Sequence, residues 1–564
     1  MTKIRTQSGP KKLNKTKATL GILALGALAL IVLIVFRFLF PALTMGFVHI
    51  VTLPAYFFLW ATLYVAIAFG ILATCLKGER FEFGVGSVTG LLLLATIALM
   101  HLFAAGALGE YALFQVYGTT KSTQGIPIPA IESAKFVPRN IAETRLRTAG
   151  DNSQLNVTQI DEGIIITKEG ESHIGFIAFM RGRDLETKIS GNTELVYIDA
   201  HNGQQSAKKK LVLRILPGGT VGSDPERAFY ASLPWWDGTS HDSGEIIPII
   251  NELDESLKLA MPVTTPKTSF VGIVPISNIP VYSGIVLINP VAGTSKYRNV
   301  SEVQADPVLS RARLFPAKLA DEVAEASRFA GVQGLGDFIR ALLPSQVSSY
   351  SNYELAPEPE EAGNWPALYT SGTKGKEKAF LYFPYLPNSS SRALAREVSI
   401  NADSGEIHVK NIVGGVASPG WIIDSVLKQR LAAEQLLQSS FGQFDEPTPL
   451  ELDGKRFYVF PITSKAGSAV IAYAISGTKI GDQTGQVQVQ FVKTPQEVES
   501  WLSNPQFTNQ NLREVFLGQS SIPNQGANQQ PAQQSENLRL ETKIDALTEQ
   551  VKALTKAIEA QQKK

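Results

Sequence analysis

The densest group of potentially reactive side chains in the sequence lies between Trp235 and Glu245. Asp237, His241, Asp242 and Glu245 offer oxygen and nitrogen donors, which hold divalent cations when they converge. The two adjacent tryptophans could instead stack on a sugar or enter a layer of lipid headgroups. A packed surface loop explains the same residues without any ligand. The sequence therefore assigns no metal, cofactor or catalytic residue to this segment.

Known catalytic signatures are missing from the rest of the chain. We find no Gly-x-Ser-x-Gly, His-Glu-x-x-His, Walker or EF-hand pattern. The glycines of 331–336 resemble a nucleotide loop, but they follow a helical stretch rather than a strand, so we expect a helix end there. Cys75 is the only cysteine, which excludes an intrachain disulfide and a cysteine zinc site. These absences favour a protein that is not an enzyme.

Three further titratable residues attract attention because they lie in a strongly apolar region. His49, His101 and Glu110 fall within residues 18–117, which are otherwise almost entirely hydrophobic. Ionisable groups inside a membrane often mark proton or ion pathways. Here His101 has no carboxylate at a matching depth, so we expect helix–helix hydrogen bonding or an interfacial position instead.

The apolar region itself predicts membrane-spanning helices. A crossing needs about 20 apolar residues, and such runs occupy 19–43, 44–76 and about 84–114. We predict about three spans; two spans with a re-entrant segment, or four short spans, are alternatives. The basic tail before residue 18 contains no acidic residue, so the positive-inside rule places the N-terminus in the cytoplasm. An odd number of spans then makes the remaining body extracytoplasmic, in contact with membrane lipid.

The body after residue 117 reads as a mixture of strands and helices. Its strand-like runs are rich in Val, Ile, Tyr and Phe and end at Gly, Asn, Asp or Pro. The clearest helices are Pro316–Phe329, Pro419–Phe441 and one capped by Thr494. The predicted fold class is a membrane-anchored α+β protein with a two-lobed body. The predicted divisions are a basic tail (1–17), transmembrane helices (18–117), a connector (118–140), lobe 1 (141–350), an acidic Pro-rich linker (351–365), lobe 2 (366–518), a Gln/Asn-rich linker (519–536) and a coiled-coil helix (537–564).

One short pattern recurs in the body. Ile198–Gln204 (IDAHNGQ) closely matches Ile400–Glu406 (INADSGE), Ile288–Thr294 is a looser copy, and Asp482–Gln486 is a partial one. In each, an Asp or Asn side chain can cap backbone amides before a Gly takes the left-handed conformation. Ordinary hairpins explain any single copy, whereas the repetition favours duplicated hairpin modules.

This strand ending resembles the closing hairpin of PepSY-type modules, which are small α+β units on extracytoplasmic and membrane-anchored prokaryotic proteins. The resemblance covers a few dozen residues. It implies a non-catalytic binding or regulatory module and transfers no catalytic residue to this chain.

The C-terminal segment carries a heptad pattern. Its apolar residues alternate in steps of four and three, with β-branched residues at a and leucines at d, which favours a parallel dimer. The seam consists of Leu540, Ile544, Leu547, Val551, Leu554 and Ile558. We expect self-association, or pairing with a partner helix, through 540–558.

The composition narrows the function classes further. With 564 residues the chain is too long for one ordinary domain, and its net charge of +1 does not favour nucleic acid as a partner. The leading hypothesis is a non-enzymatic scaffold or binding subunit of a cell-envelope assembly. The alternatives are an enzyme or a regulator of an envelope peptidase, and an accessory subunit of a transporter or channel.

Overall fold

The structure is a computed structural model. It describes residues 109–118, 126–127, 134–152, 155–182, 191–217, 225–234, 240–242, 244–271, 274–330, 353–355, 367–372, 376–387, 393–412, 415–433, 441–445, 447–452, 455–464, 469–479, 487–508 and 515.

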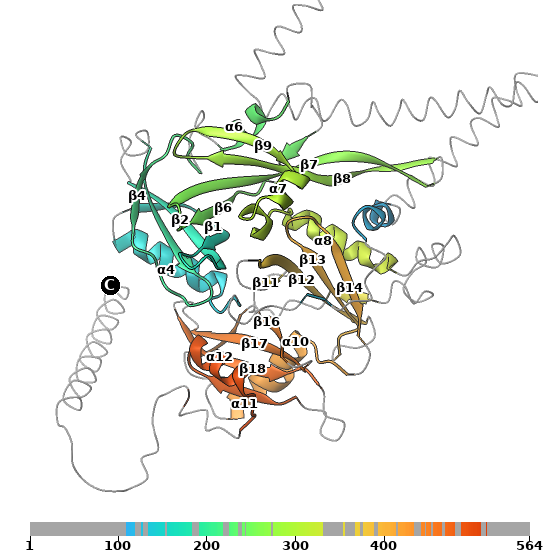
Figure 1. The fold of residues 1–564 in the computed structure, drawn as a ribbon. Helices are drawn as coiled ribbons and strands as arrows, with labels where there is room; N and C mark the ends of the chain where they lie inside the picture. The colour runs from blue at the N-terminus through green and yellow to red at the C-terminus, as the bar shows by residue number, and fades with distance from the viewer. Residues whose placement is uncertain are drawn as a thin grey trace, which may run out of the picture. The chain divides into compact units, whose positions relative to one another are not determined.

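In these residues the chain repeats one unit four times: a helix followed by an antiparallel meander of strands (Figure 1). We call the copies modules 1 to 4. Module 1 contains α4 (Arg139–Asn152), β1 (Leu155–Ile166), β2 (Ser172–Gly182), β3 (Asn192–Asp199) and β4 (Lys209–Val212). Module 2 contains α6 (Pro225–Ser232), β5 (His241–Asp242), β6 (Ile247–Asn251), β7 (Ser256–Val271), β8 (Val274–Asn289) and β9 (Thr294–Asn299).

The second half of the chain repeats this order. Module 3 contains α8 (Ala317–Glu325), η3 (Ala326–Phe329), β10 (Tyr353–Leu355), β11 (Ala367–Ser371), β12 (Lys378–Pro387), β13 (Arg396–Asn401) and β14 (Ile407–Asn411). Module 4 contains α10 (Pro419–Ile422), η5 (Ile423–Leu427), α11 (Lys428–Ala433), β15 (Phe441–Phe444), β16 (Thr448–Leu452), β17 (Lys455–Ser464), β18 (Val470–Gly477) and β19 (Val489–Val492). Outside the repeat lie α7 (Val300–Ala305), η2 (Leu309–Arg311) and α12 (Pro495–Ser503).

The modules combine into three sheets. Parallel pairing of β1 with β6 fuses modules 1 and 2 into a nine-stranded sheet, in the order β4-β3-β2-β1-β6-β7-β8-β9 with β5 on β7. Modules 3 and 4 each form a five-stranded sheet, ordered β10-β12-β13-β14 with β11 on β12, and β15-β17-β18-β19 with β16 on β17. All other pairings between the strands of the described residues are antiparallel, as short connections between successive strands allow.

A proline at one repeated register explains why the first strand of modules 2, 3 and 4 is split. Pro262, Pro384 and Pro461 lie in the second long strand, between the residues that pair with the two pieces of the first strand. Proline has no N–H for a ladder hydrogen bond, so pairing is interrupted there. Module 1 has Phe179 at this register, and its first strand stays continuous with a bulge at Thr158.

The turn after the third strand closes each module in the same way. The carbonyl oxygen of Ala200 accepts the successive amides of Phe136 and Val137, both at 2.8 Å, just before α4. The equivalent carbonyls of Pro290 and Ala402 each accept two amides from the segment preceding their own module's helix, and Thr478 accepts one. The repeat therefore extends beyond strand order to the contact that joins the start of each module to its end.

The turns that carried the recurring sequence pattern have the predicted geometry in three places. Gly203, Gly293 and Gly405 have φ values of +72°, +72° and +76°. Each donates its amide to the Asp or Asn that ends the preceding strand, at 2.8–2.9 Å. The partial copy at 482–486 lies outside the described residues. The helix starting after Thr494 is also confirmed: the Thr494 hydroxyl accepts the Glu497 amide.

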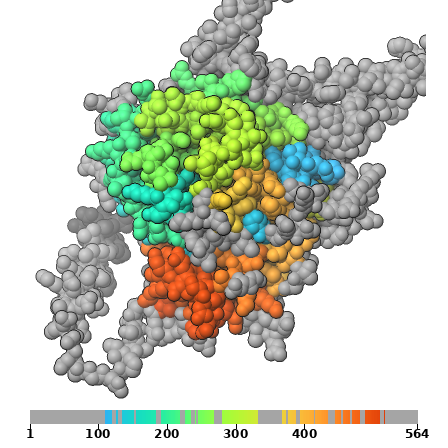
Figure 2. Space-filling model, in the orientation of Figure 1, coloured from blue at the N-terminus to red at the C-terminus, as the bar shows by residue number. Residues whose placement is uncertain are grey.

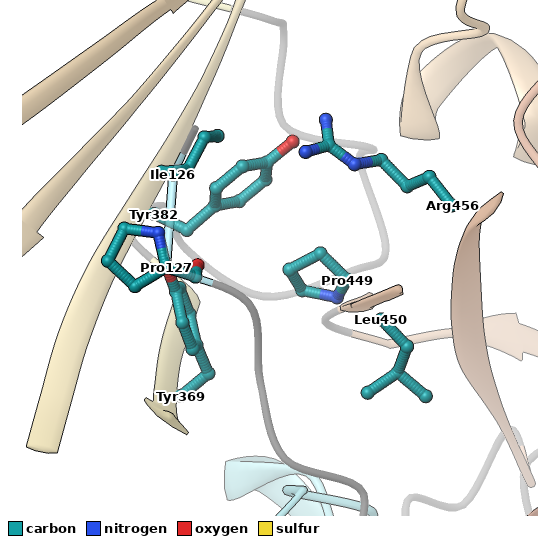
Figure 3. A pocket seen from close by; sticks show the side chains of 7 residues that line it. All are labelled: Ile126, Pro127, Tyr369, Tyr382, Pro449, Leu450 and Arg456. Carbon is teal, nitrogen blue, oxygen red and sulfur yellow. Dashed lines mark hydrogen bonds between the residues drawn. The ribbon is translucent and has the colours of Figure 1, made fainter. Parts of the chain in front are cut away.

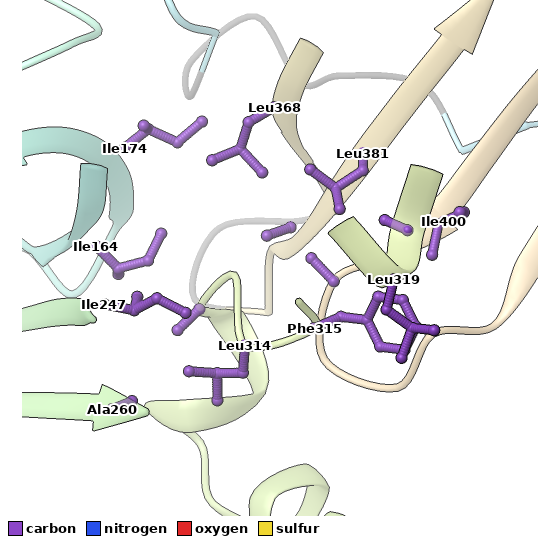
Figure 4. Packing of buried hydrophobic residues seen from close by; sticks show 14 of the residues in the cluster. Ile164, Ile174, Ile247, Ala260, Leu314, Phe315, Leu319, Leu368, Leu381 and Ile400 are labelled. Carbon is purple, nitrogen blue, oxygen red and sulfur yellow. The ribbon is translucent and has the colours of Figure 1, made fainter. Parts of the chain in front are cut away.

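The largest apolar core joins modules 1, 2 and 3. Ile164 and Ile174 of module 1 and Ile247 of module 2 lie opposite Leu368 and Leu381 of module 3 (Figure 4). A separate cluster fills module 4 and its boundary with module 3, and its members include Phe444, Phe460 and Phe491. Because cores are shared, the modules do not bury their apolar faces independently.

The predicted membrane anchor is contradicted. In the part of the chain that the structure describes, no helix combines the length and apolar character needed to cross a membrane. Residues 109–117 are helical, and Ala112, Leu113 and Tyr117 are buried in the largest core rather than facing lipid. Figure 1 draws this segment as a blue helix beside α8, and Figure 2 shows it in blue against the gold surface of module 3. On this finding, the predictions of transmembrane helices, a multi-pass location and an extracytoplasmic body are wrong. Most of 18–117 lies outside the described residues.

The rest of the predicted fold class is also corrected. The body is mostly sheet, arranged as three sheets rather than two α+β lobes, because modules 1 and 2 form one sheet and modules 1 to 3 share a core. No coiled coil is present in the described residues, and the predicted helix at 537–564 lies outside them, as does the linker 519–536. The predicted linker 351–365 contains β10, which pairs with β12 of module 3. The predicted domain divisions are otherwise untested.

Candidate functional site

A small pocket lies between modules 3 and 4 (Figure 3). Strands β11 and β12 form one wall, and β16 and β17 form the other. The pocket is lined by Ile126, Pro127, Tyr369, Tyr382, Pro449, Leu450 and Arg456. Two of these residues come from the connector that precedes module 1, so three distant parts of the sequence meet here.

Beneath this pocket lies a buried network of charged and phenolic groups. Glu397 of β13 has no exposed surface, and its carboxylate accepts a hydrogen bond from the Tyr382 hydroxyl at 2.6 Å. Its second oxygen accepts from the Arg456 guanidinium of β17. The hydroxyls of Tyr382 and Tyr458 lie 3.0 Å apart. A buried carboxylate is tolerated because charged and neutral donors from both sheets satisfy it.

The electrostatics of this network reinforce the ordinary protonation states of its two tyrosines and its arginine. Burial raises the pKa of the Tyr382 and Tyr458 hydroxyls further above their usual range. Burial alone would lower the pKa of the Arg456 guanidinium, but attraction to Glu397 outweighs it and the pKa is raised. The tyrosines remain neutral donors and the arginine remains charged. Neither these tyrosines nor this arginine titrates near neutrality, where general acid–base catalysis works best.

Ile126 and Pro127 form part of the pocket wall, and a specific contact fixes them there. The Tyr369 hydroxyl donates to the Pro127 carbonyl at 2.7 Å. Since a carbonyl only accepts, Ser399 must supply the hydrogen for the 2.7 Å contact between its hydroxyl and that of Tyr369. Ile126 is only 5% exposed and belongs to the apolar cluster of modules 3 and 4. The connector is therefore held by both apolar burial and a directed hydrogen bond.

A second polar cluster surrounds His173 at the start of β2. Its Nδ1 lies 2.7 Å from an Asp199 carboxylate oxygen, and its Nε2 lies 3.5 Å from Glu171. Burial lowers the pKa of the imidazole, but the Asp199 hydrogen bond and the charges of Asp199 and Glu171 outweigh this and raise it. The cluster favours a protonated histidine at the beginning of the strand.

His201 extends this cluster toward module 4. Its Nδ1 contacts the Ala134 carbonyl at 2.9 Å and therefore carries a hydrogen. Its Nε2 lies 3.2 Å from Glu499 on α12, and the His173 and His201 rings are 5.1 Å apart. Although histidines and carboxylates gather here, no three of them in the described residues have a geometry suited to one metal ion. The cluster links the end of β3 to α12.

The structure describes only part of the segment between Trp235 and Glu245. Glu245 accepts hydrogen bonds from Arg313 at 2.8 Å and from the Ala317 amide at 2.7 Å, so it fixes the start of α8. His241 and Asp242 contribute their backbone to β5. The tryptophans and Asp237 lie outside the described residues. The described part of this segment supports α8 and β7 instead of converging on a ligand.

Of the other titratable candidates, the structure describes Glu110 and His408. Glu110 pairs with Arg328 at 2.7 Å, and burial raises its carboxyl pKa. His49 and His101 lie outside the described residues. His408 is half-buried on β14 with its ring against Phe380, and burial lowers its pKa.

Sequence reasoning missed the network beneath the pocket, although a signal was present. Lys378–Pro384 reads KAFLYFP and Lys455–Pro461 reads KRFYVFP. These two heptapeptides occupy the same place in modules 3 and 4 and share Lys, Phe, Phe and Pro at matching positions. Comparing strands as well as turns would have revealed this second repeat. It would not have paired Glu397 with Arg456, because that contact joins different modules.

Comparisons with known proteins assign this chain to no family. No family model matches the chain, and no curated protein does either. A levansucrase variant from Bacillus subtilis is 9% identical over 64% of this chain and 81% of its own, with a TM-score of 0.16. B. subtilis levansucrase itself is 9% identical over 63% and 78%, also with a TM-score of 0.16. At these scores the likeness carries no argument about fold or function.

Proposed function

We propose that this protein is a non-enzymatic scaffold or binding subunit assembled from four related modules. The observation that carries the proposal is the satisfied network at the boundary of modules 3 and 4. Tyr382, Glu397 and Arg456 are engaged with one another, which is the arrangement of a structural joint rather than of a poised nucleophile or base. The PepSY-type resemblance of the turns supports a binding or regulatory role for each module.

The alternative is an enzyme or a peptidase regulator with a site around His173 and His201. The gathering of two imidazoles with Asp199, Glu171 and Glu499 favours it. Structural ion-pair networks perturb titratable groups in the same way, so the cluster alone does not define an active site.

Single hydroxyl deletions test whether the network acts as a structural joint or takes part in catalysis. Tyr382→Phe and Tyr458→Phe each remove one buried hydrogen-bonding group, which costs about 1–2 kcal/mol of unfolding free energy. For a scaffold, both variants melt at lower temperature, but in the cells of origin they keep the same chemical crosslinks to partners as the wild type. Loss of biological activity with unchanged melting temperature and unchanged crosslinks would contradict the scaffold and favour catalysis.

A further inference from the structure

We propose that the contact between His201 and Glu499 is a pH-sensitive latch, which ties module 1 to α12 more tightly in acid. His201 lies in the turn after β3 of module 1, and Glu499 lies on α12, the helix that follows module 4. Their side chains approach to 3.2 Å. The latch therefore joins the first module to the helix after the last one.

The hydrogen on the neutral His201 ring is placed by Ala134. Nδ1 lies 2.9 Å from the Ala134 carbonyl oxygen, which can only accept, so Nδ1 carries a hydrogen. In the neutral ring the other nitrogen, Nε2, then has none. Nε2 faces the Glu499 carboxylate, so two hydrogen-bond acceptors meet and the contact gives no attraction.

A proton on Nε2 reverses the sign of this contact, because an imidazolium and a carboxylate attract each other. An imidazole takes up a proton near about pH 6.5 and a carboxylate near about pH 4, so a histidine–glutamate pair is oppositely charged between these values. The His201 side chain is 14% exposed and that of Glu499 is 39% exposed, so water screens the pair only in part. The latch should therefore strengthen as the pH falls from about 8 to about 5.5.

Two further carboxylates offset the charge that the histidines gain. Asp199 accepts the His201 backbone amide at 2.8 Å and lies 2.7 Å from Nδ1 of His173. Glu171 lies 3.5 Å from the other nitrogen of His173. The two histidine rings are 5.1 Å apart, so a charge on one opposes a charge on the other. With Glu499, three carboxylates face two imidazoles, which allows both rings to be charged.

Three cations border the same cluster from other elements. Arg145 of α4 approaches the turn that carries His201. Arg311 of η2 donates to the Ser172 hydroxyl at 3.3 Å, and Lys135 pairs with Glu162 at 2.9 Å. Their positive charges oppose protonation of the histidines. The direct partner of His201 is Glu499, so removing that one carboxylate isolates the latch.

The latch adds to a joint that apolar contacts already make. Val498 and Leu502 of α12 are fully buried on module 4, in the cluster that also contains Phe136 from the start of module 1. Helix α12 therefore stays folded without the latch. What protonation changes is the free energy needed to open α12 locally, which hydrogen exchange reports.

The test measures hydrogen exchange of the full-length chain by mass spectrometry at pH 5.5 and pH 8, with each rate divided by the intrinsic rate at that pH. Protection of α12 should be roughly 2- to 5-fold higher at pH 5.5, as expected for a partly exposed ion pair. Glu499→Gln and His201→Gln should each abolish this response, because neither neutral side chain gains a charge. Protection of α6 in module 2 should be the same in the wild type and in Glu499→Gln at each pH.

Two control variants separate the latch from other effects. Glu497→Gln makes the same change two residues earlier on α12, where the carboxylate accepts the Lys493 amide at 2.8 Å. It should lower protection of α12 at both pH values and leave the pH response intact. His173→Gln removes the neighbouring imidazole and should also leave the response of α12 in place.

A response of α12 that persists in Glu499→Gln would overturn the inference. Loss of the response in His173→Gln would do the same, because it would assign the pH dependence to His173 and Asp199. Equal protection of wild-type α12 at the two pH values would show that the contact between His201 and Glu499 is not a latch.

Discussion

Asp161 on β1 shows how a single buried carboxyl can set the pH response of a fold. One of its oxygens is buried without a hydrogen-bond partner. Burial raises the pKa of this carboxyl from 3.8 to about 6, against the opposing effects of Gln159, Arg139 and Arg313. A folded-state pKa above the unfolded value means that the protonated acid suits the fold, and that ionisation destabilises it.

We therefore expect Asp161→Asn to stabilise the protein increasingly between pH 4 and pH 6, and then by a constant amount. The shift from 3.8 to about 6 corresponds to roughly 3 kcal/mol at neutral pH, at 1.36 kcal/mol per pKa unit. Urea unfolding of the variant and the wild type, at pH 4 and pH 7, measures this difference. Asp254→Asn is the control, because the Ser256 hydrogen bond lowers the pKa of that exposed carboxyl and its removal should bring no such gain. A variant no more stable than the wild type at pH 7 would contradict the prediction.

At the scale of the element, the repeated turn is constrained by its conformation and by what packs against it. Gly405 and Gly170 both have positive φ, +76° and +80°. A Cβ on Gly405 would lie 2.2 Å from the Phe315 ring, whereas a Cβ on Gly170 would meet nothing within 4 Å. Phe315 cannot easily move, because its ring makes edge-to-face contacts with the rings of Tyr117 and Tyr282.

The two glycines give a matched pair of substitutions. Gly170→Ala should cost only the left-handed backbone conformation, about 1–2 kcal/mol. Gly405→Ala should cost the same plus about 1–3 kcal/mol for overpacking against Phe315. Thermal unfolding of both variants measures the difference. Equal losses would show that the ring yields freely and that only backbone conformation requires glycine at the turn.

For the whole molecule, the important feature is that segments of one module complete the core of another. Phe136 precedes α4 of module 1, but its fully buried ring packs in a second cluster on module 4, with Phe457 and Tyr473. Phe229 on α6 is equally buried and packs only among residues of modules 1 and 2. Removing either ring leaves a cavity of similar chemistry in a different place.

Phe136→Ala and Phe229→Ala should each destabilise the protein by about 3–5 kcal/mol, but their local effects should differ. Hydrogen exchange in β17 and β18 should accelerate in Phe136→Ala and stay near wild-type rates in Phe229→Ala, at temperatures where both are folded. Exchange followed by mass spectrometry resolves the strands. The shared-core description would be wrong if β17 and β18 responded equally to the two substitutions.

The sequence alone determined the features that depend on local chemistry. Turns at Gly203, Gly293 and Gly405 were predictable because glycine readily adopts positive φ, and the helix after Thr494 because its hydroxyl can cap the first turn. Runs rich in Val, Ile, Tyr and Phe likewise indicated that the body contains strands, since these residues fit a pleated, half-buried surface.

Only the tertiary structure decided which environment buries the apolar residues and which side chains distant in sequence come into contact. Hydropathy measures the free energy of leaving water and does not distinguish lipid from a protein core, so the burial of Leu113 and Tyr117 among modules could not be read from their types. Glu397 and Arg456 are 59 residues apart in sequence. They meet only because the sheet of module 3 packs against the sheet of module 4. Their pairing depends on the whole arrangement of modules 3 and 4, which no local pattern encodes.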